Sequence, residues 1–219
     1  MADWMGHARR EQERYRDGES RLPDVDDRDA RQRQLTRMGN AAAGAALAEL
    51  MGGNTASARE WFARAAERYR ESYEHAPPAS WGRPIAILKA RVLAGDGDAA
   101  AADAEWTLDQ SAAEAASPIG RYGGCLALLI LGRDEEARTL AQALRSNADF
   151  PTAVGDALAM IGAHDSIGYG EAIEAVLESF ESRDDYLEDV PVADTVLVLQ
   201  ALAERRGLAA ELSSPLLPG

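Results

Sequence analysis

The sequence has very little cysteine and no long apolar run. Its 219 residues contain one cysteine, Cys125, so no disulfide can form within the chain. Because Cys125 lies in the apolar stretch 125–131, we expect a small buried side chain rather than a reactive thiol. No run approaches the roughly 18 uninterrupted apolar residues of a membrane span, and the first residues lack the apolar core of a signal peptide. The sequence therefore predicts a cytoplasmic protein.

Lysine is also almost absent: Lys89 is the one lysine among 23 basic residues, whereas Asp and Glu together number 37. The net charge of −14 lies in residues 38–219, because residues 1–37 carry equal numbers of basic and acidic side chains. A nucleic-acid partner requires a positive surface, so we expect none. Two explanations of the acidity stay open. One is adaptation to a high-salt cytoplasm, in which surface carboxylates keep proteins hydrated and apart; the other is a basic partner.

Combinations of residues that support catalysis are scarce. The three histidines are far apart in sequence: His7, His75 and His164. The acidic run that begins at Asp24 resembles a calcium loop, but Asp29 stands where that loop needs glycine and Leu35 where it needs glutamate. There is no Gly-x-Ser-x-Gly elbow, and close helix packing explains the glycines of 120–124 better than a phosphate site does. We expect neither enzymatic activity nor a metal or other cofactor.

Proline and glycine divide the rest of the chain into segments of similar length. Four prolines begin apolar, helix-like stretches at intervals of 34, 33 and 40 residues: Pro84, Pro118, Pro151 and Pro191. Each stretch runs into a glycine: Gly95, Gly132, Gly162 and Gly207. Proline is tolerated in a first helical turn, and glycine supplies the left-handed residue that often follows a helix. The pattern predicts repeated helices with these starts and ends.

A second pattern follows some of the glycines. The residues five and nine places on are Ala58 and Phe62 from Gly53, Ala102 and Trp106 from Gly97, and Ala137 and Ala141 from Gly132. From Gly162 the fifth residue is Ile167, so the pattern decays there. A small residue at the first place lets two antiparallel helices approach closely, which is typical of helical hairpins.

These patterns predict an all-α fold of antiparallel helical hairpins stacked as a short α-solenoid. The expected helices are near 2–16, 29–51, 55–75, 80–94, 98–116, 118–131, 134–147, 151–162, 166–182 and 191–206. We expect a frayed N-terminal helix with an acidic loop (1–28), a helical-repeat domain (29–207) and an irregular tail (208–219). Alternating apolar and polar runs bounded by hairpin turns are missing, so a sheet is not expected.

The stretch Leu131-Gly-Arg-Asp-Glu-Glu-Ala137 resembles the turn between the helices of tetratricopeptide repeats, in which glycine precedes alanine by five places. Residues 38–182 carry this resemblance, and Gly162 with Ile167 departs from it. The resemblance implies a degenerate tetratricopeptide-like (TPR-like) array that binds protein through a concave surface. Residues 191–218 are similar to the end of the forty-ninth immunity-protein family of bacterial polymorphic toxin systems, where a last helix runs into an Arg-Gly turn and then Ser-Pro and Leu-Pro. That similarity implies direct binding and neutralisation of a toxin.

The first helices of solenoid hairpins usually line the concave face, so polar or aromatic residues within them are candidates for partner binding. These residues are Arg83, Arg121, Tyr122, Asp156 and Asp194. Arginine and tyrosine are favoured at binding hot spots. The alternative is structural: the arginines pair with acidic neighbours, and Tyr122 packs between hairpins.

The function that we predict is non-catalytic binding of another protein, as an adaptor or an immunity-type protein. The alternative is a small-molecule sensor or regulatory domain with a pocket between helices, which Trp61, Trp81, Trp106 and Tyr122 would line.

Overall fold

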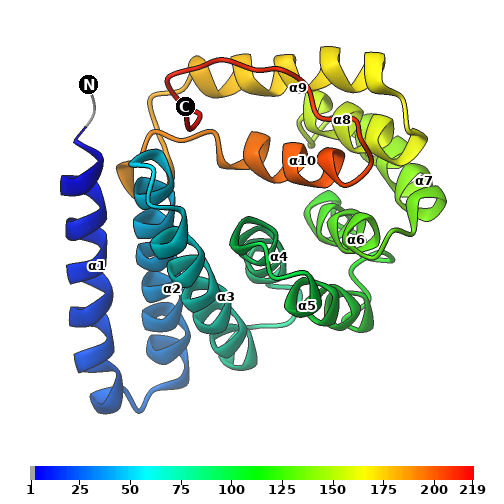
Figure 1. The fold of residues 1–219 in the computed structure, drawn as a ribbon. Coiled ribbons are helices and arrows are strands. Elements are labelled where there is room, and N and C mark those ends of the chain that lie inside the picture. The colour runs from blue at the N-terminus through cyan, green and yellow to red at the C-terminus, as the bar shows by residue number, and fades with distance from the viewer. Residues whose placement is uncertain (1–2) are drawn as a thin grey trace. The chain divides into compact units, whose positions relative to one another are not determined.

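The computed structural model describes residues 3–219, and every regular element in this range is a helix (Figure 1). The α-helices are α1 (Trp4–Arg21), α2 (Arg28–Met51), α3 (Thr55–His75), α4 (Gly82–Ala94), α5 (Gly97–Asp109), α6 (Pro118–Ile130), α7 (Asp134–Arg145), α8 (Thr152–Ala163), α9 (Ser166–Glu181) and α10 (Asp194–Glu204). Two short 3-10 helices are η1 (Leu22–Asp24) and η2 (Leu187–Asp189). The prediction of an all-α fold is confirmed. None of the described helices is both long and apolar enough to cross a membrane.

The chain forms two compact units. Unit 1 comprises residues 1–95, 184–192 and 215–219, and unit 2 comprises residues 96–183 and 193–214. The segment expected to form one helical-repeat domain, 29–207, therefore contributes to both units.

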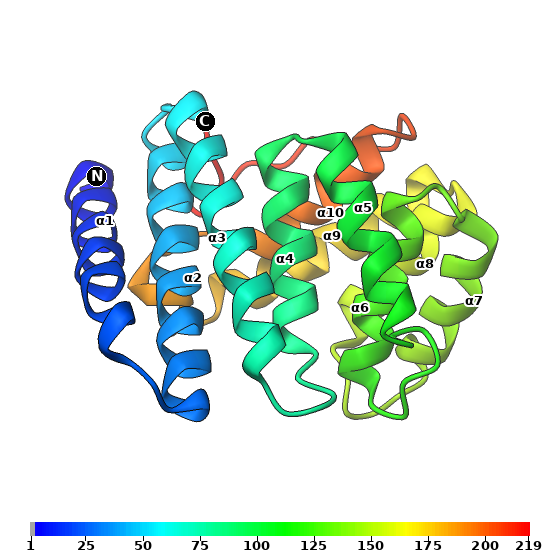
Figure 2. The same ribbon diagram turned by 90° about the horizontal axis from the view of Figure 1, so that it is seen from below.

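In unit 1 each helix packs against the next: α1 against α2, α2 against α3, and α3 against α4. Figure 2 shows these four helices in a row. The helix α2 contains six alanines and a glycine in its second half, and the run from Ala41 to Ala48 is buried throughout. Small side chains all around a helix permit close neighbours on both sides, and α1 and α3 occupy those sides.

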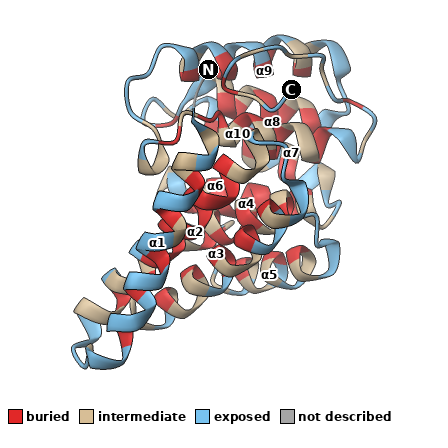
Figure 3. Ribbon diagram, turned by 60° about the vertical axis from the view of Figure 1, so that its left-hand side comes forward, coloured by how far each residue is buried: buried red, intermediate tan, exposed pale blue. Residues whose placement is uncertain are grey.

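In unit 2 the helices α5 to α9 also pack consecutively, and α10 packs against both α8 and α9. Leu126, Leu158 and Ile173 lie in the core of this unit, with almost no exposed surface. Figure 3 shows buried residues gathered on the helix sides that face neighbours and exposed residues along the outer side of α9. The consecutive, hairpin-like packing predicted from the proline and glycine pattern is confirmed within each unit.

The N-terminal helix differs from the expectation of a short, frayed segment. It continues to Arg21 and packs against α2, with Ala8 and Tyr15 buried. Gly18 does not end this helix. A Cβ atom on Gly18 would lie 2.7 Å from Met38 Cγ, so glycine here lets α1 approach α2 closely.

The short turns between consecutive helices explain why the spacing pattern decayed. Four of these turns contain a residue in the left-handed conformation, with φ between 55° and 81°: Gly53, Gly95, Gly132 and His164. The residues five and nine places after them are Ala58 and Phe62, Ala100 and Ala104, Ala137 and Ala141, and Tyr169 and Ile173. All eight are buried. The spacing must therefore be counted from Gly95 and His164 rather than from Gly97 and Gly162. Counted in this way, the pattern holds at all four turns.

Gly162 was wrongly predicted to end its helix. It lies inside α8, which continues to Ala163 and is capped by His164 at φ 55°. A Cβ atom on Gly162 would lie 3.0 Å from both the Asp134 carbonyl oxygen and the Arg138 amide nitrogen. The glycine therefore serves the close approach of α8 to α7. The stretch 98–116 also departs from expectation, because α5 ends at Asp109 and Ser111 turns the chain with φ 62°.

Candidate functional site

The five candidate residues occupy separate places. Arg83 lies in unit 1 at the start of α4, where its Nε–H donates to Ser72 Oγ at 2.7 Å and its Nη2 donates to Gln32 Oε1. Burial lowers the pKa of the Arg83 guanidinium. With its donors directed at α2 and α3, Arg83 connects three helices of unit 1, which agrees with a structural role.

Tyr122 and Asp194 are brought together in unit 2. Tyr122 is buried on α6, and its ring lies 5.4 Å from that of Phe150 between centroids. Burial and the charge of Asp194, at the start of α10, both raise the pKa of Tyr122 above its usual range. The phenol therefore stays protonated near neutral pH. A buried ring contacts no partner from solution, so Tyr122 packs between helices as the structural alternative expects.

Asp156 lies on α8 and accepts a hydrogen bond from Arg145 Nε at 2.5 Å. Both side chains are partly exposed. They line an open groove of about 450 Å³ between α8 and α9, named here the α8–α9 groove. Its other lining residues are Thr152, Ala153, Met160, Gly168, Glu171, Ala172 and Ala175.

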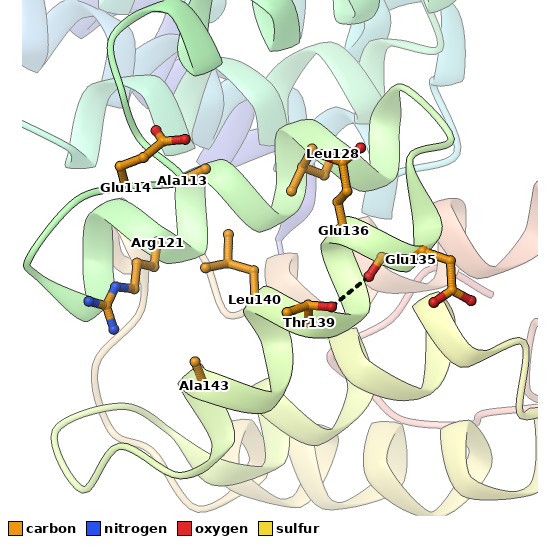
Figure 4. A pocket seen from close by; sticks show the side chains of 9 residues that line it. All are labelled: Ala113, Glu114, Arg121, Leu128, Glu135, Glu136, Thr139, Leu140 and Ala143. Atoms are coloured by element: carbon orange, nitrogen blue, oxygen red, sulfur yellow. Dashed lines mark hydrogen bonds between the residues drawn. The ribbon is translucent and has the colours of Figure 1, made fainter.

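Arg121 lies at an open groove of unit 2, named here the α6–α7 groove (Figure 4). This open groove has a volume of about 560 Å³. It is lined by Ala113, Glu114, Arg121, Leu128, Glu135, Glu136, Thr139, Leu140 and Ala143. Figure 4 shows Leu140 at its centre, between the 110–117 connection and α7. Arg121 is held in place because its Nε–H donates to the Ala115 carbonyl at 2.8 Å.

Apolar groups form the floor of the α6–α7 groove and charged groups its rim. Glu135 pairs with Arg138 at 2.7 Å and Glu136 with Arg133 at 2.6 Å, both one turn away along the chain. Glu114 is exposed and has no ion-pair partner among residues 3–219. The rim carries three carboxylates and one guanidinium, but two of the carboxylates already pair with arginines, which leaves Glu114 and Arg121 as the charges open to a partner. This arrangement suits an apolar group with charged neighbours of either sign.

Sequence reasoning missed the groove floor. Ala137, Leu140, Ala141 and Leu144 follow one another at spacings of three, one and three, which is typical of the core side of a helix, and three of these residues are buried. Leu140 is only partly buried and points into the groove. The only sign of this exposure in the sequence is that Leu140 lies at the edge of the apolar stripe. An edge position is equally consistent with a groove and with contact to another helix.

Polar groups elsewhere in unit 2 hold helices together. Arg206, with 7% of its side chain exposed, donates to Asp134 from both Nε and Nη2. It also donates to the carbonyls of Leu129 at 2.7 Å and Leu202 at 2.8 Å. His164 Nε2 lies 2.7 Å from the other Asp134 oxygen. Burial alone would raise the pKa of Asp134, but hydrogen bonds from Arg206 and His164 outweigh it and the pKa is lowered.

A comparable cluster lies in unit 1 and fastens the segment 184–192 to α1. Glu11 has no exposed surface and accepts from Arg10 at 2.7 Å and from Arg14 at 2.8 Å. Arg14 also pairs with Glu188, and Arg10 donates to the Glu188 carbonyl at 2.8 Å. Both arginines therefore have a structural use on this side of α1.

Cys125 is buried on α6, as expected for a small core side chain. Its Sγ–H donates to the Ala137 carbonyl at 3.5 Å, and burial raises the pKa of the thiol to about 12. The thiol therefore stays protonated at neutral pH, whereas reactive cysteines are thiolates.

Within residues 3–219, no group of three or more His, Cys, Asp or Glu side chains is placed to hold a metal ion. Comparison of the chain with models of known families, with characterised proteins and with solved structures finds no match.

Proposed function

We propose that this protein binds another protein, without catalysis, through the α6–α7 groove. One observation supports this most: an open apolar floor, centred on Leu140, lies on packed helices and is bordered by charged side chains. Sites on helices hold their geometry better than sites on loops. Two of the lining residues, Arg121 and Leu128, come from α6, one of the first helices from which the partner-binding residues were predicted.

The open form of the α6–α7 groove favours a protein partner over an enclosed small ligand. Small-molecule sites usually bury most of the surface of the ligand in a deep cleft. An open groove between helices instead receives side chains from the apolar face of a partner helix or from an extended segment. Leu140 would contact such an apolar side chain, and Glu114 and Arg121 would give it polar neighbours.

The toxin-neutralising version of this proposal depends on the similarity of residues 191–218 to the immunity-protein family. Arg206 of the Arg-Gly turn in that segment is used structurally, since it binds Asp134 and two backbone carbonyls. The similarity therefore contributes no partner-binding residue of its own. The adaptor version and the immunity version share the α6–α7 groove and are tested by the same variants.

Replacing Leu140 with arginine is expected to abolish partner capture. The new side chain would fill the groove and place a charge on its apolar floor. Folding is expected to persist, because Leu140 is partly exposed and an arginine there would lie one turn from Glu136. The measurement compares tagged wild-type protein with Leu140→Arg in pull-downs from native extract, with partner recovery quantified by mass spectrometry.

Gln142→Arg is the matched control, because it makes the same change of charge at an exposed position of α7 outside the groove. The proposal requires a stoichiometric partner that Gln142→Arg retains and Leu140→Arg loses. Equal recovery by both variants, or no stoichiometric partner of the wild-type protein, contradicts it. A metabolite that raises the melting temperature of the wild type but not of Leu140→Arg would instead establish the small-molecule alternative.

A further inference from the structure

The acidity of the chain is concentrated in one of its two units. Unit 1 contains 16 basic and 18 acidic residues, for a net charge of −2, whereas unit 2 contains 7 and 19, for a net charge of −12. The two units carry nearly equal numbers of carboxylates, and their net charges differ because unit 2 has fewer than half as many basic residues. Unit 2 therefore has an excess of carboxylates over basic side chains, and a basic partner would be attracted to this excess charge.

The α8–α9 groove is an apolar channel on this acidic unit. Met160, Ala153, Ala172 and Ala175 are the apolar residues that line it. Gly168 also lines it, and a Cβ atom there would lie 2.6 Å from Met160 Sδ. The flexible thioether of methionine adapts to side chains of different shape, which is why methionine is frequent at binding surfaces.

The two sides of the α8–α9 groove differ in charge. On the α8 side, Asp156 forms an ion pair with Arg145 at 2.5 Å. On the α9 side, Glu171, Glu174 and Glu178 are exposed, and none of them has an ion-pair partner within the described chain. Their spacing of three and four places them along one side of α9, in line with the apolar edge of the groove.

Ile167 begins the same line of side chains, four residues before Glu171, and 78% of its surface is exposed. It is one of three large hydrophobic residues exposed in the described chain. The left-handed turn residue before α9 is His164, so the buried residue five places on is Tyr169 and not Ile167. Ile167 therefore lies on the surface. An apolar side chain and three unpaired carboxylates thus follow one edge of an apolar groove.

We propose that the α8–α9 groove binds a basic amphipathic helix of a partner protein. Apolar side chains of that helix would enter the groove beside Met160 and Ala175, and one would cover Ile167. Its arginine or lysine side chains, spaced three or four residues apart, would pair with Glu171, Glu174 and Glu178. Helix-in-groove binding uses this combination of apolar anchors and flanking charges.

The proposal concerns a surface separate from the α6–α7 groove and does not depend on it. A designed 18-residue amphipathic helical peptide of leucine and lysine serves as the probe, with an otherwise identical leucine and glutamate peptide for comparison. Binding is measured by fluorescence anisotropy at several salt concentrations. The lysine peptide is expected to bind and to weaken as salt rises, because salt screens exposed charge pairs; the glutamate peptide is expected not to bind.

The decisive comparison separates this groove from the overall negative charge of unit 2. The triple variant Glu171→Gln, Glu174→Gln, Glu178→Gln is expected to weaken binding of the lysine peptide about tenfold. The control triple variant Asp98→Asn, Glu105→Gln, Asp109→Asn changes the same charge at exposed positions of α5 in the same unit. It is expected to bind like the wild type. Equal weakening by both triple variants would show general attraction to an acidic surface and overturn the proposal.

A second pair of variants tests the apolar part without any change of charge. Ala175→Gln inserts a longer side chain into the groove and is expected to weaken the lysine peptide severalfold, roughly as a lost apolar contact does. Ala102→Gln makes the same change at an exposed position of α5 and is expected to have no effect. Unchanged binding by Ala175→Gln places the peptide elsewhere and contradicts the proposal. Leu140→Arg should bind the peptide normally, which keeps this test distinct from that of the α6–α7 groove.

Discussion

Replacing Arg206 with alanine is expected to lower the free energy of unfolding by about 3–5 kcal/mol, as removal of one partner from a buried ion pair does. Arg206 is almost fully buried and donates to Asp134 and to the carbonyls of Leu129 and Leu202. Without it, Asp134 loses its main counter-charge and the end of α6 loses a donor. Urea unfolding followed by circular dichroism measures the change.

Arg205→Ala is the matched control, because Arg205 precedes Arg206 and is exposed. It should change stability by no more than about 0.5 kcal/mol, as surface substitutions usually do. A similar loss in both variants would mean that the hydrogen bonds of Arg206 contribute little to holding α10 against the start of α7.

The cluster of Asp134, Arg206 and His164 makes the stability of the fold depend on pH. The pKa of Asp134 is lowered in the folded protein, although burial by itself would raise it, because Arg206 and His164 donate to the carboxylate. Its contribution to stability is therefore complete above the pKa of the unfolded chain, about 4. It is lost as the pH falls below that value and through the folded-state pKa. Arg206→Ala is expected to flatten this part of the stability profile, and an unchanged profile would contradict the assignment.

Gly124→Ala is expected to destabilise the protein by about 1–3 kcal/mol, the usual effect of overpacking. A Cβ atom on Gly124 would lie 2.6 Å from both the Cα and the amide nitrogen of Ala113. Both are backbone atoms, so the connection 110–117 or α6 itself would have to move. The shift is expected to disturb the α6–α7 groove as well, since Ala113 lines it.

Gly170→Ala is expected to stabilise the protein, in contrast to Gly124→Ala. Gly170 also lies inside a helix, α9, but nothing lies within 4 Å of the position a Cβ atom would take. Alanine favours the helix by roughly 0.5–1 kcal/mol over glycine, so this variant should be more stable than the wild type. Thermal unfolding of the two variants side by side distinguishes a glycine required by packing from one that is not. Destabilisation of the same size in both would refute this explanation.

Helix positions were predictable because their signals are local. Pro118 begins α6 as predicted, with the hydroxyl of Ser117 capping the helix, and Gly95 and Gly132 take the left-handed conformation expected after a helix. Errors arose where a glycine has a tertiary use. Gly18 and Gly162 look like helix ends in the sequence, but both allow two helices to approach closely. His164 takes the left-handed role that the count had given to glycine.

The candidate site was less predictable because a groove depends on which helix edges stay uncovered. Arg121 and Asp156 do line grooves. Tyr122 is buried and Arg83 is bound by neighbouring helices, so a polar residue on a first helix is not by itself a surface residue. Leu140 belongs to a core stripe by spacing, and only the packing of the 110–117 connection leaves it partly exposed.

Photo-crosslinking from the centre of the α6–α7 groove tests most directly whether this groove binds a protein. Leu140 is replaced by the photoreactive residue p-benzoylphenylalanine, and the exposed Gln142 by the same residue as control. After irradiation in native extract, we expect one protein to be joined to position 140 and not to position 142. Adducts of equal yield and identity at the two positions, or no protein adduct at position 140, would contradict a partner bound in this groove.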